Sequence, residues 1–427
     1  MKKSILALFA LSTLALSSCS SDDDNNGGNT PTPTANVVSV TGSIEGNQTW
    51  TNDNIYQLNQ KVVVQDGATL TIEPGTIIKG SSGTGSLASA LVIARGGKLM
   101  AEGTASQPII MTSASDDITV GETMGSNLDQ NDRGLWGGLI VLGKAPCSFS
   151  NDVGAIQIEG IPAEDEWGLY GGTDAADNSG VMKYISIRHG GALIGEGNEI
   201  NGLTLGGVGT GTEIDNIEVV ANVDDGIEFF GGTVNASNLL VWAQGDDAVD
   251  IDQAYSGIID NVVVHLGEAS DHAFEIDGPE GSAAGSFTLQ NASIFGNNVT
   301  SNGEYADYRK AATGVTKNIF AANFPAGKDV ELDNNAVAQK FISGDLTFEN
   351  WEVAGADNTI FVEKVGCAEN CDDDDDSNDV DEVQIIDPSF TSQAASWTTT
   401  VSGQTNVGAD TSAFGWTYSN AKAGLGY

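Results

Sequence analysis

A short segment recurs through the middle of the chain, and this repeat restricts the fold more than any other feature of the sequence. Three copies align so that Asn216, Asn238 and Asn261 occupy the same position, 22 and 23 residues apart. Each copy holds two short runs in which apolar and polar residues alternate on either side of a polar turn, which is typical of β-strands. A strand repeat of this length predicts a parallel β-solenoid, whose coils stack about 4.8 Å apart. A leucine-rich-repeat horseshoe is excluded, because neither a leucine framework nor a helical period recurs.

The aligned asparagine recurs beyond these three copies, and Tyr184 replaces it in the segment upstream. An asparagine at a sharp turn tolerates the left-handed backbone conformation, and its amide can bond to the residues above and below it. We therefore expect an internal asparagine ladder along the solenoid. The predicted ladder consists of Asn216, Asn238, Asn261, Asn291, Asn318 and Asn350.

The N-terminal half carries a looser version of the same alternation, with glycine at the corners, in residues 62–80, 90–113 and 133–146. The strings LTIEPGTIIKG, AEGTASQPIIMTS and WGGLIVLGKAP in these segments resemble a family of secreted or lipid-anchored right-handed β-helix proteins of Bacteroidota, related in fold to pectate lyases. The resemblance extends from about Val37 to Tyr427 and includes the closing string FGWTYSNA. It implies that residues 37–427 form a single all-β domain, a right-handed parallel β-helix.

Residues 1–18 have the pattern of a targeting segment rather than of a folded element. Two lysines precede an apolar stretch that is too short to span a bilayer as a mature helix. The stretch ends in the string LSSC at Cys19, which resembles a lipobox, where the cysteine is acylated and becomes the new N-terminus. We expect Cys19 to anchor the protein to a membrane through lipid alone. An ordinary cleaved signal peptide is the alternative.

Residues 19–36 are rich in Gly, Pro and polar residues, which predicts a flexible acidic tether. The run Asp22, Asp23 and Asp24 resembles the surface-export signal of Bacteroidota lipoproteins. The resemblance implies a protein that is anchored in the outer membrane and faces the outside of the cell. Solvated linker charges without a sorting role are the alternative.

The charge of the chain excludes several classes of partner. Seventeen basic and 59 acidic residues give a formal net charge of −42. A chain this acidic will not bind nucleic acid through phosphate contacts, nor be drawn to anionic lipid by its charge. It is not disordered either, because 40% of its residues are hydrophobic, enough for a large core.

Three cysteines follow Cys19. Cys367 and Cys371 lie in an acidic loop at about residues 366–382, and in an exported protein they can close a small disulfide. A metal site is the alternative, although CxxxC without a nearby histidine is a poor zinc signature. Cys147 is then left unpaired, and we expect it to be buried.

Stacking the repeats places carboxylates above one another on the outer surface. Glu228, Asp250 and Glu275 align, with Asp252 and Asp277 two residues later in their copies. Carboxylates about 4.8 Å apart repel one another unless a proton or cation intervenes. This pattern favours a Ca²⁺ site, because Ca²⁺ takes clustered oxygen ligands. The alternative is that these and the neighbouring turn aspartates only cap corners and remain solvated.

A second outer row contains large side chains four residues after the asparagine position. It consists of Arg188, Trp242, His265 and Phe295. Flat side chains stacked along a solenoid would suit an extended glycan, whose sugar rings lie on aromatic faces. The alternative is that this row packs beneath an inserted loop such as residues 190–212.

Catalysis has weaker support in the sequence. Asp246 and Asp247 resemble the paired aspartates of β-helix polygalacturonases, but the Gly-His-Gly and Arg-x-Lys motifs of that family are absent. A pectate-lyase mechanism would use the calcium-binding carboxylates with Arg309 as the base, and Glu275 is a further candidate catalytic residue. The sequence motif that such lyases carry is missing, however. Polyanionic pectin would also be repelled by this chain unless Ca²⁺ bridged the two.

These observations favour a lipid-anchored surface protein with a non-catalytic binding or scaffold role, which contacts glycan along the β-helix and is stabilised by Ca²⁺. A Ca²⁺-dependent polysaccharide lyase or glycoside hydrolase is the first alternative. A structural or adhesion protein of the cell surface is the second.

Overall fold

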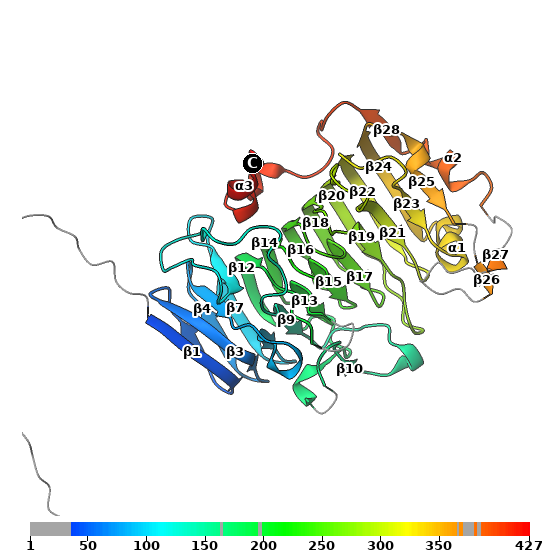
Figure 1. Ribbon diagram of the computed structural model, residues 1–427. Coiled ribbons are helices and arrows are strands. Elements are labelled where there is room, and N and C mark those ends of the chain that lie inside the picture. Colours follow the sequence, from blue (N-terminus) through cyan, green and yellow to red (C-terminus); the bar gives the residue numbers. More distant parts are fainter. Residues whose placement is uncertain (1–35, 163–164, 195–198, 365–366, 370–379, 382–385) are drawn as a thin grey trace, which may run out of the picture. The chain divides into compact units, whose positions relative to one another are not determined.

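The computed structural model describes residues 36–427, apart from 163–164, 195–198, 365–366, 370–379 and 382–385. Cys19 and Cys371 lie outside the described residues, and so does most of the acidic loop. The described strands include one sheet of 24 strands, whose successive coils pair in parallel (Figure 1). The all-β, right-handed parallel β-helix expected from the repeat is therefore confirmed.

The looser N-terminal coils are formed by β1 (Asn36–Ile44), β2 (Gln48–Trp50), β3 (Asn54–Val64), β4 (Thr69–Ile72), β5 (Ile77–Gly80), β6 (Ala90–Ile93), β7 (Lys98–Glu102), β8 (Ile109–Ser113) and β9 (Leu139–Leu142). The regular coils are formed by β12 (Gly180–Arg188), β13 (Leu203–Gly206), β14 (Glu213–Val220), β15 (Ile227–Phe230), β16 (Ala236–Trp242), β17 (Val249–Asp252), β18 (Ile258–His265), β19 (His272–Ile276), β20 (Phe287–Phe295), β21 (Glu304–Tyr308), β22 (Gly314–Ala322), β23 (Val330–Leu332), β24 (Leu346–Ala354), β25 (Phe361–Glu363) and β28 (Thr398–Val401). Two short antiparallel pairs lie outside this sheet, β10 (Ile156–Gln157) with β11 (Leu169–Tyr170) and β26 (Cys367–Glu369) with β27 (Val380–Asp381).

The register of the coils follows the aligned repeat. Ile217 pairs with Leu239, and Leu239 pairs with Val262 in the next coil. These side chains point into the solenoid and are fully or almost fully buried. Each buried aliphatic side chain contributes about 1.5–3 kcal/mol. The stacked aliphatic rows are therefore the main source of stability.

The asparagine position forms a corner of each regular coil. Asn216, Asn238 and Asn261 have φ values of 56°, 55° and 60°, and Tyr184 has a φ of 50°. The backbone pairing of β14 with β16 includes residues on both sides of Asn216 and Asn238 but not these two residues themselves. The chain therefore bends here, as the left-handed tendency of asparagine predicts.

The asparagines do not line the inside of the coils, so the expected internal ladder is not confirmed. The amide of Asn261 donates to Asn238 at 2.6 Å, and Asn350 donates to Asn318 at 2.9 Å. However, Asn238 donates to Asp215 instead of to Asn216. Most of these side chains are half-buried or exposed, because aliphatic residues already fill the interior at this corner.

The C-terminal end of the solenoid is closed by two helices that the repeat did not predict. These are α1 (Asn335–Ser343) and α2 (Phe390–Ala394). The Asn334 side chain caps the start of α1, and Gly344 ends it in the left-handed conformation with a φ of 78°. Phe341 of α1 and Phe390 of α2 pack on each other with ring centroids 4.9 Å apart. No helix among the described residues is both long and apolar enough to cross a bilayer.

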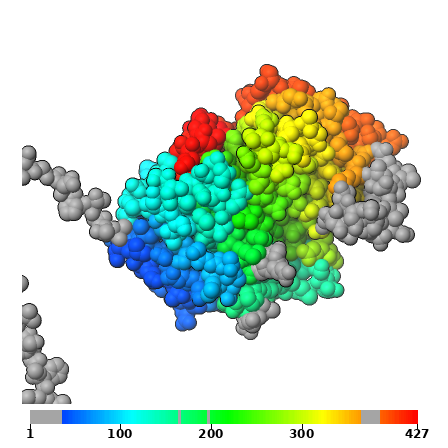
Figure 2. All heavy atoms as spheres, in the orientation of Figure 1, coloured from blue at the N-terminus to red at the C-terminus, as the bar shows by residue number. Residues whose placement is uncertain are grey.

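The last residues return along the outside of the solenoid. We call residues 404–427, which include α3 (Tyr418–Ala423), the C-terminal segment. This segment follows β28 in the chain but lies beside β14 and β16 (Figure 1), and it forms a separate mass on the surface, red in Figure 2. Phe414 packs against Leu240 and Val263, and Tyr418 packs against Val220.

A buried carboxylate fixes the C-terminal segment to the sheet. Glu218 is fully buried, and its oxygens accept hydrogen bonds from the backbone N–H groups of Tyr418 and Ser419 at 3.1 and 2.7 Å. It also accepts bonds from the hydroxyls of Ser186 and Ser419. Burial lowers the pKa of the Arg188 guanidinium, and the charge of Glu218 opposes this lowering.

We expect Glu218→Ala to lower the free energy of unfolding by about 3–5 kcal/mol, because it leaves a buried cation and several N–H donors without their acceptor. Urea denaturation measures the loss, and limited proteolysis should cleave first within residues 404–427. Glu45→Ala, at an exposed position, is the matched control. Equal stability of the two variants would contradict this account of Glu218.

Candidate functional site

The outer face of one strand series carries a continuous row of carboxylates. Parallel pairing aligns Glu228 with Asp250, and Asp250 with Glu275. The same register extends to Asp307 and Glu331. We call these five residues, on β15, β17, β19, β21 and β23, the acidic row.

Sequence reasoning identified the first three members of the acidic row and missed the last two. The spacing from Asn261 to Asn291 is 30 residues, longer than in the earlier copies. Because this connection is longer, the repeat spacing no longer shows that Asp307 aligns with Glu275. The alternating string EYADY contained the signal, because it has the same pattern as the strand around Glu275.

The acidic row points away from the core, yet most of it is not solvated. Glu228, Asp250 and Asp307 are only 6%, 7% and 8% exposed. Asn201 donates a hydrogen bond to Glu228 from above the sheet. The connection between β9 and β12 also covers this region, where Tyr170 packs on Phe230 with ring centroids 5.9 Å apart. The alternative of freely solvated turn carboxylates is therefore wrong for these residues, because long connections between coils cover the face.

Three of the buried carboxylates converge. One ligand oxygen each from Asp225, Glu228 and Asp250 lies within 4.8 Å of the others, and all three residues are buried. We call them the buried triad. Oδ1 of Asp250 is inaccessible to solvent and has no hydrogen-bond partner among the described residues. No lysine, arginine or histidine in the described part of the chain forms an ion pair with the triad.

The electrostatics of the buried triad follow from this arrangement. Burial, and then repulsion between neighbouring carboxylates, raises the pKa of Asp225, Glu228 and Asp250 well above the ordinary range. At neutral pH such a group must either retain protons or bind a cation. Ca²⁺ prefers oxygen ligands such as carboxylates. In the triad, Glu228 and Asp225 each already accept one hydrogen bond, from Asn201 and from the backbone N–H of Asp247, whereas Oδ1 of Asp250 accepts none from the described residues.

The acidic residues in the following coils are neutralised by the chain itself. Nε of Arg309 lies 2.9 Å from Asp277, and a terminal nitrogen of Arg309 forms an ion pair with Glu275. Lys310 contacts the other oxygen of Asp277 at 2.8 Å. Glu275 and Asp277 were expected as metal ligands together with Glu228, Asp250 and Asp252. The structure instead gives these two residues basic partners.

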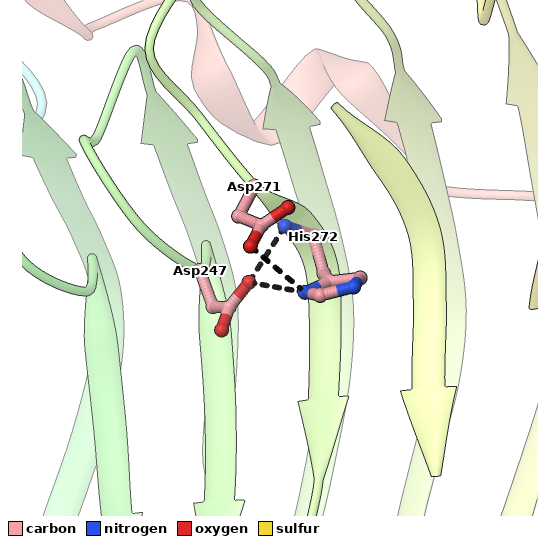
Figure 3. Close-up of side chains that lie close together, drawn as sticks. All are labelled: Asp247, Asp271 and His272. Atoms are coloured by element: carbon pink, nitrogen blue, oxygen red, sulfur yellow. Dashed lines mark hydrogen bonds and ion pairs between the residues drawn. The ribbon is translucent and has the colours of Figure 1, made fainter. Parts of the chain in front are cut away.

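Figure 3 shows a third cluster, in which Asp271 and His272 at the start of β19 face Asp247 of the preceding coil. Nδ1 of His272 lies 2.9 Å from Asp247, and the backbone N–H of His272 donates to the same oxygen at 2.6 Å. Burial lowers the pKa of His272, but the negative charges of Asp247 and Asp271 outweigh burial and raise this pKa to about 10. The protonated ring is therefore a cation at neutral pH and forms an ion pair with Asp247.

The two consecutive aspartates expected to act in catalysis differ in access. Asp247 is buried and bonded to His272, whereas Asp246 is exposed at the turn. Although Asp246 is exposed as a residue, neighbouring protein atoms partly desolvate its carboxyl, and this desolvation, followed by the charge of Asp247, raises the pKa of Asp246 to about 6. Asp246 is therefore the accessible carboxyl of the pair.

The row of large side chains is aligned as expected but lies under the C-terminal segment. The guanidinium of Arg188 is 4.3 Å from the ring centre of Tyr418, and Trp242 also packs near this ring. His265 stacks on Phe295 with centroids 4.5 Å apart and bonds to the Tyr427 hydroxyl at 2.6 Å. The alternative that this row packs beneath another segment agrees with the structure, but the covering segment is not residues 190–212. The cover comes from a segment more than a hundred residues away along the chain.

The cysteines can be placed only in part. Cys147 is free and half-buried, and burial raises the pKa of its thiol to about 12. Cys367 begins β26, but Cys371, its expected partner, and Cys19, the expected acylation site, lie outside the described residues.

The parallel coils and the charged outer face define a right-handed β-helix protein with an acidic surface built on one strand series. A family model described as a pectate-lyase-like β-helix domain matches residues 42–417, and the chain belongs to this family. No curated protein and no solved structure is significantly similar to the chain.

Asp307 provides a test of the buried charge. Burial, and then Asp333, raises the pKa of Asp307 to about 7, above the value of about 3.9 in an unfolded chain. Its contribution to stability is therefore present below about pH 4 and is lost as the pH rises through about 7. We compare the free energy of unfolding of Asp307→Asn with that of the unsubstituted protein at each pH. The difference should favour the variant by about 1–3 kcal/mol more at pH 8 than at pH 5, measured by urea unfolding in calcium-free buffer.

The exposed Asp66→Asn is the control, and it should not change the pH dependence. The same pH dependence in Asp307→Asn and in the unsubstituted protein would show that Asp307 is not perturbed.

Proposed function

We propose that this protein is a surface-anchored, non-catalytic binding protein that holds Ca²⁺ at the buried triad and presents its β-helix to glycan. The observation that carries the proposal is the convergence of Asp225, Glu228 and Asp250, with Oδ1 of Asp250 buried and without a partner among the described residues.

The choice of Ca²⁺ follows from the ligand atoms. Three carboxylates offer hard oxygen ligands, and Ca²⁺ accepts six to eight of these in a flexible geometry that water can complete. Mg²⁺ demands a near-ideal octahedron, and no such arrangement is imposed by three carboxylates from two adjacent coils. A divalent ion also removes most of the repulsion within the triad.

The glycan and the location are supported by charge and by the N-terminal sequence. A net charge of −42 repels anionic polymers, so a neutral glycan, or one bridged by Ca²⁺, is the compatible extended ligand. Cys19 in its lipobox-like context and the acidic tether that follows support lipid attachment to the outer membrane on the outer side.

Calcium binding can be measured directly on the full chain produced without acylation (Cys19→Ala). We expect Ca²⁺ to raise the Tm, with about 2.7 kcal/mol of stabilisation at 100 times its Kd, and calorimetric titration to give one site. Asp250→Asn should abolish the site, because it removes one negative charge and replaces one of the two carboxylate oxygens with an NH₂ group that cannot bind a cation.

Asp66→Asn, which alters an exposed carboxylate, should bind Ca²⁺ as the unsubstituted chain does. If chelator leaves the Tm unchanged and titration shows no binding, the protein does not hold calcium at the triad.

A Ca²⁺-dependent polysaccharide lyase or hydrolase is the second candidate, and the raised pKa of the accessible Asp246 favours it, since a general acid needs such a value. Arg309 argues against a lyase, because Glu275 and Asp277 keep it charged and occupied, and a base must be free to accept a proton.

We expect no turnover when the full chain is incubated with a panel of neutral and acidic polysaccharides and Ca²⁺, with detection of new reducing or unsaturated ends. Turnover that disappears in both Asp246→Asn and Arg309→Lys, but persists in Asp66→Asn, would show that the protein is an enzyme.

A further inference from the structure

A groove of about 720 Å³ lies between the asparagine corner and the C-terminal segment, away from the acidic row. One wall is formed by Tyr184, Asp215 and Asn216 at the bends of β12 and β14, and the other by Trp416 of the C-terminal segment. We propose that this groove binds a sugar ring of an uncharged glycan. The inference rests on the glycan part of the proposed function and assigns the glycan to a site.

The two aromatic walls provide apolar surface. The rings of Tyr184 and Trp416 lie 5.5 Å apart at an interplanar angle of 71°, and both side chains are half-buried. They therefore form an L-shaped surface, and an aromatic face of this kind packs on the C–H face of a pyranose. A pocket of apolar surface with a few convergent polar groups is the usual form of a small-ligand site.

Tyr184 occupies a position that the following coils give to asparagine. Its backbone is left-handed, with a φ of 50°, which is unfavourable for a large side chain. Asn216, in the next coil, has nearly the same conformation without this penalty. The ring of Tyr184 thus stands at a strained position, where it packs edge-to-face on Trp416 in the lining of the groove.

The polar groups of the groove are available to a ligand. The side chain of Asn216 is 5% exposed but makes no hydrogen bond within the described residues, whereas Asn238 donates to Asp215 at 2.7 Å. Ser237 donates to the same oxygen of Asp215 at 2.8 Å, and no described residue donates to its other oxygen. An amide and a carboxylate oxygen provide donors and acceptors for the hydroxyls of one sugar.

The charge of the groove restricts the class of sugar. Asp215 would repel uronic acids and phosphate at this position, as would the net charge of −42. A neutral hexose or pentose unit therefore matches the groove better than an acidic one.

The test uses the full chain carrying Cys19→Ala, with affinity gel electrophoresis in laminarin, galactomannan, xyloglucan and arabinoxylan, and with polygalacturonate as the acidic probe. We expect retention by at least one neutral polysaccharide. Tyr184→Asn and Trp416→Ala should each weaken that binding at least tenfold.

Tyr184→Asn separates binding from folding, because it places in this coil the residue that the later corners already use. Its Tm should equal or exceed that of the unsubstituted chain. Asn350→Ala, which lies in the same row but outside the groove, should bind normally.

Three results would overturn the proposal in distinguishable ways. If a neutral polysaccharide still binds both Tyr184→Asn and Trp416→Ala, the glycan binds outside this groove and the proposed function remains intact. The absence of retention by every polysaccharide, polygalacturonate included, removes the groove and the glycan function together, while calcium titration tests the buried triad independently. Retention by polygalacturonate alone excludes an uncharged ligand.

Discussion

The in-register stacking of parallel coils is the constraint on which the rest of this structure depends. Because each position lies about 4.8 Å from its equivalent in the next coil, a residue type that recurs with the repeat becomes a row. Rows of aliphatic residues such as Ile217, Leu239 and Val262 stabilise the solenoid by excluding water. The same geometry forces Glu228 against Asp250, where like charges oppose folding.

The chain handles this repulsion differently at the buried triad and around Glu275, in the middle of the acidic row. Around Glu275 it supplies Arg309 and Lys310, so the carboxylates there are neutralised within the chain. At the buried triad it supplies no cation from the described residues and leaves an oxygen of Asp250 without a partner. The contrast between these two places distinguishes a structural ion network from a candidate cation site.

The fold could be predicted from the sequence because a solenoid repeats its local pattern. The positions of Asn216, Asn238 and Asn261 predicted the register, and the alignment of Glu228, Asp250 and Glu275 followed from it. Asp307 was missed because the connection before it is longer, which breaks the repeat without breaking the strand pairing. The internal ladder was not confirmed, because most of these asparagines are half-buried or exposed and Asn238 donates to Asp215 instead of to Asn216.

The sequence by itself determined that the coils stack, which residues share a row, and that carboxylates would gather on one face. Only the tertiary structure decided what lies over each row. Trp242 and His265 could have been an exposed platform, but the C-terminal segment covers them and is held by the bonds of Tyr418 and Ser419 to Glu218. That contact joins residues about 200 positions apart, and no local periodicity encodes it. The groove beside Trp416 exists for the same reason, since one of its walls is formed by this distant segment.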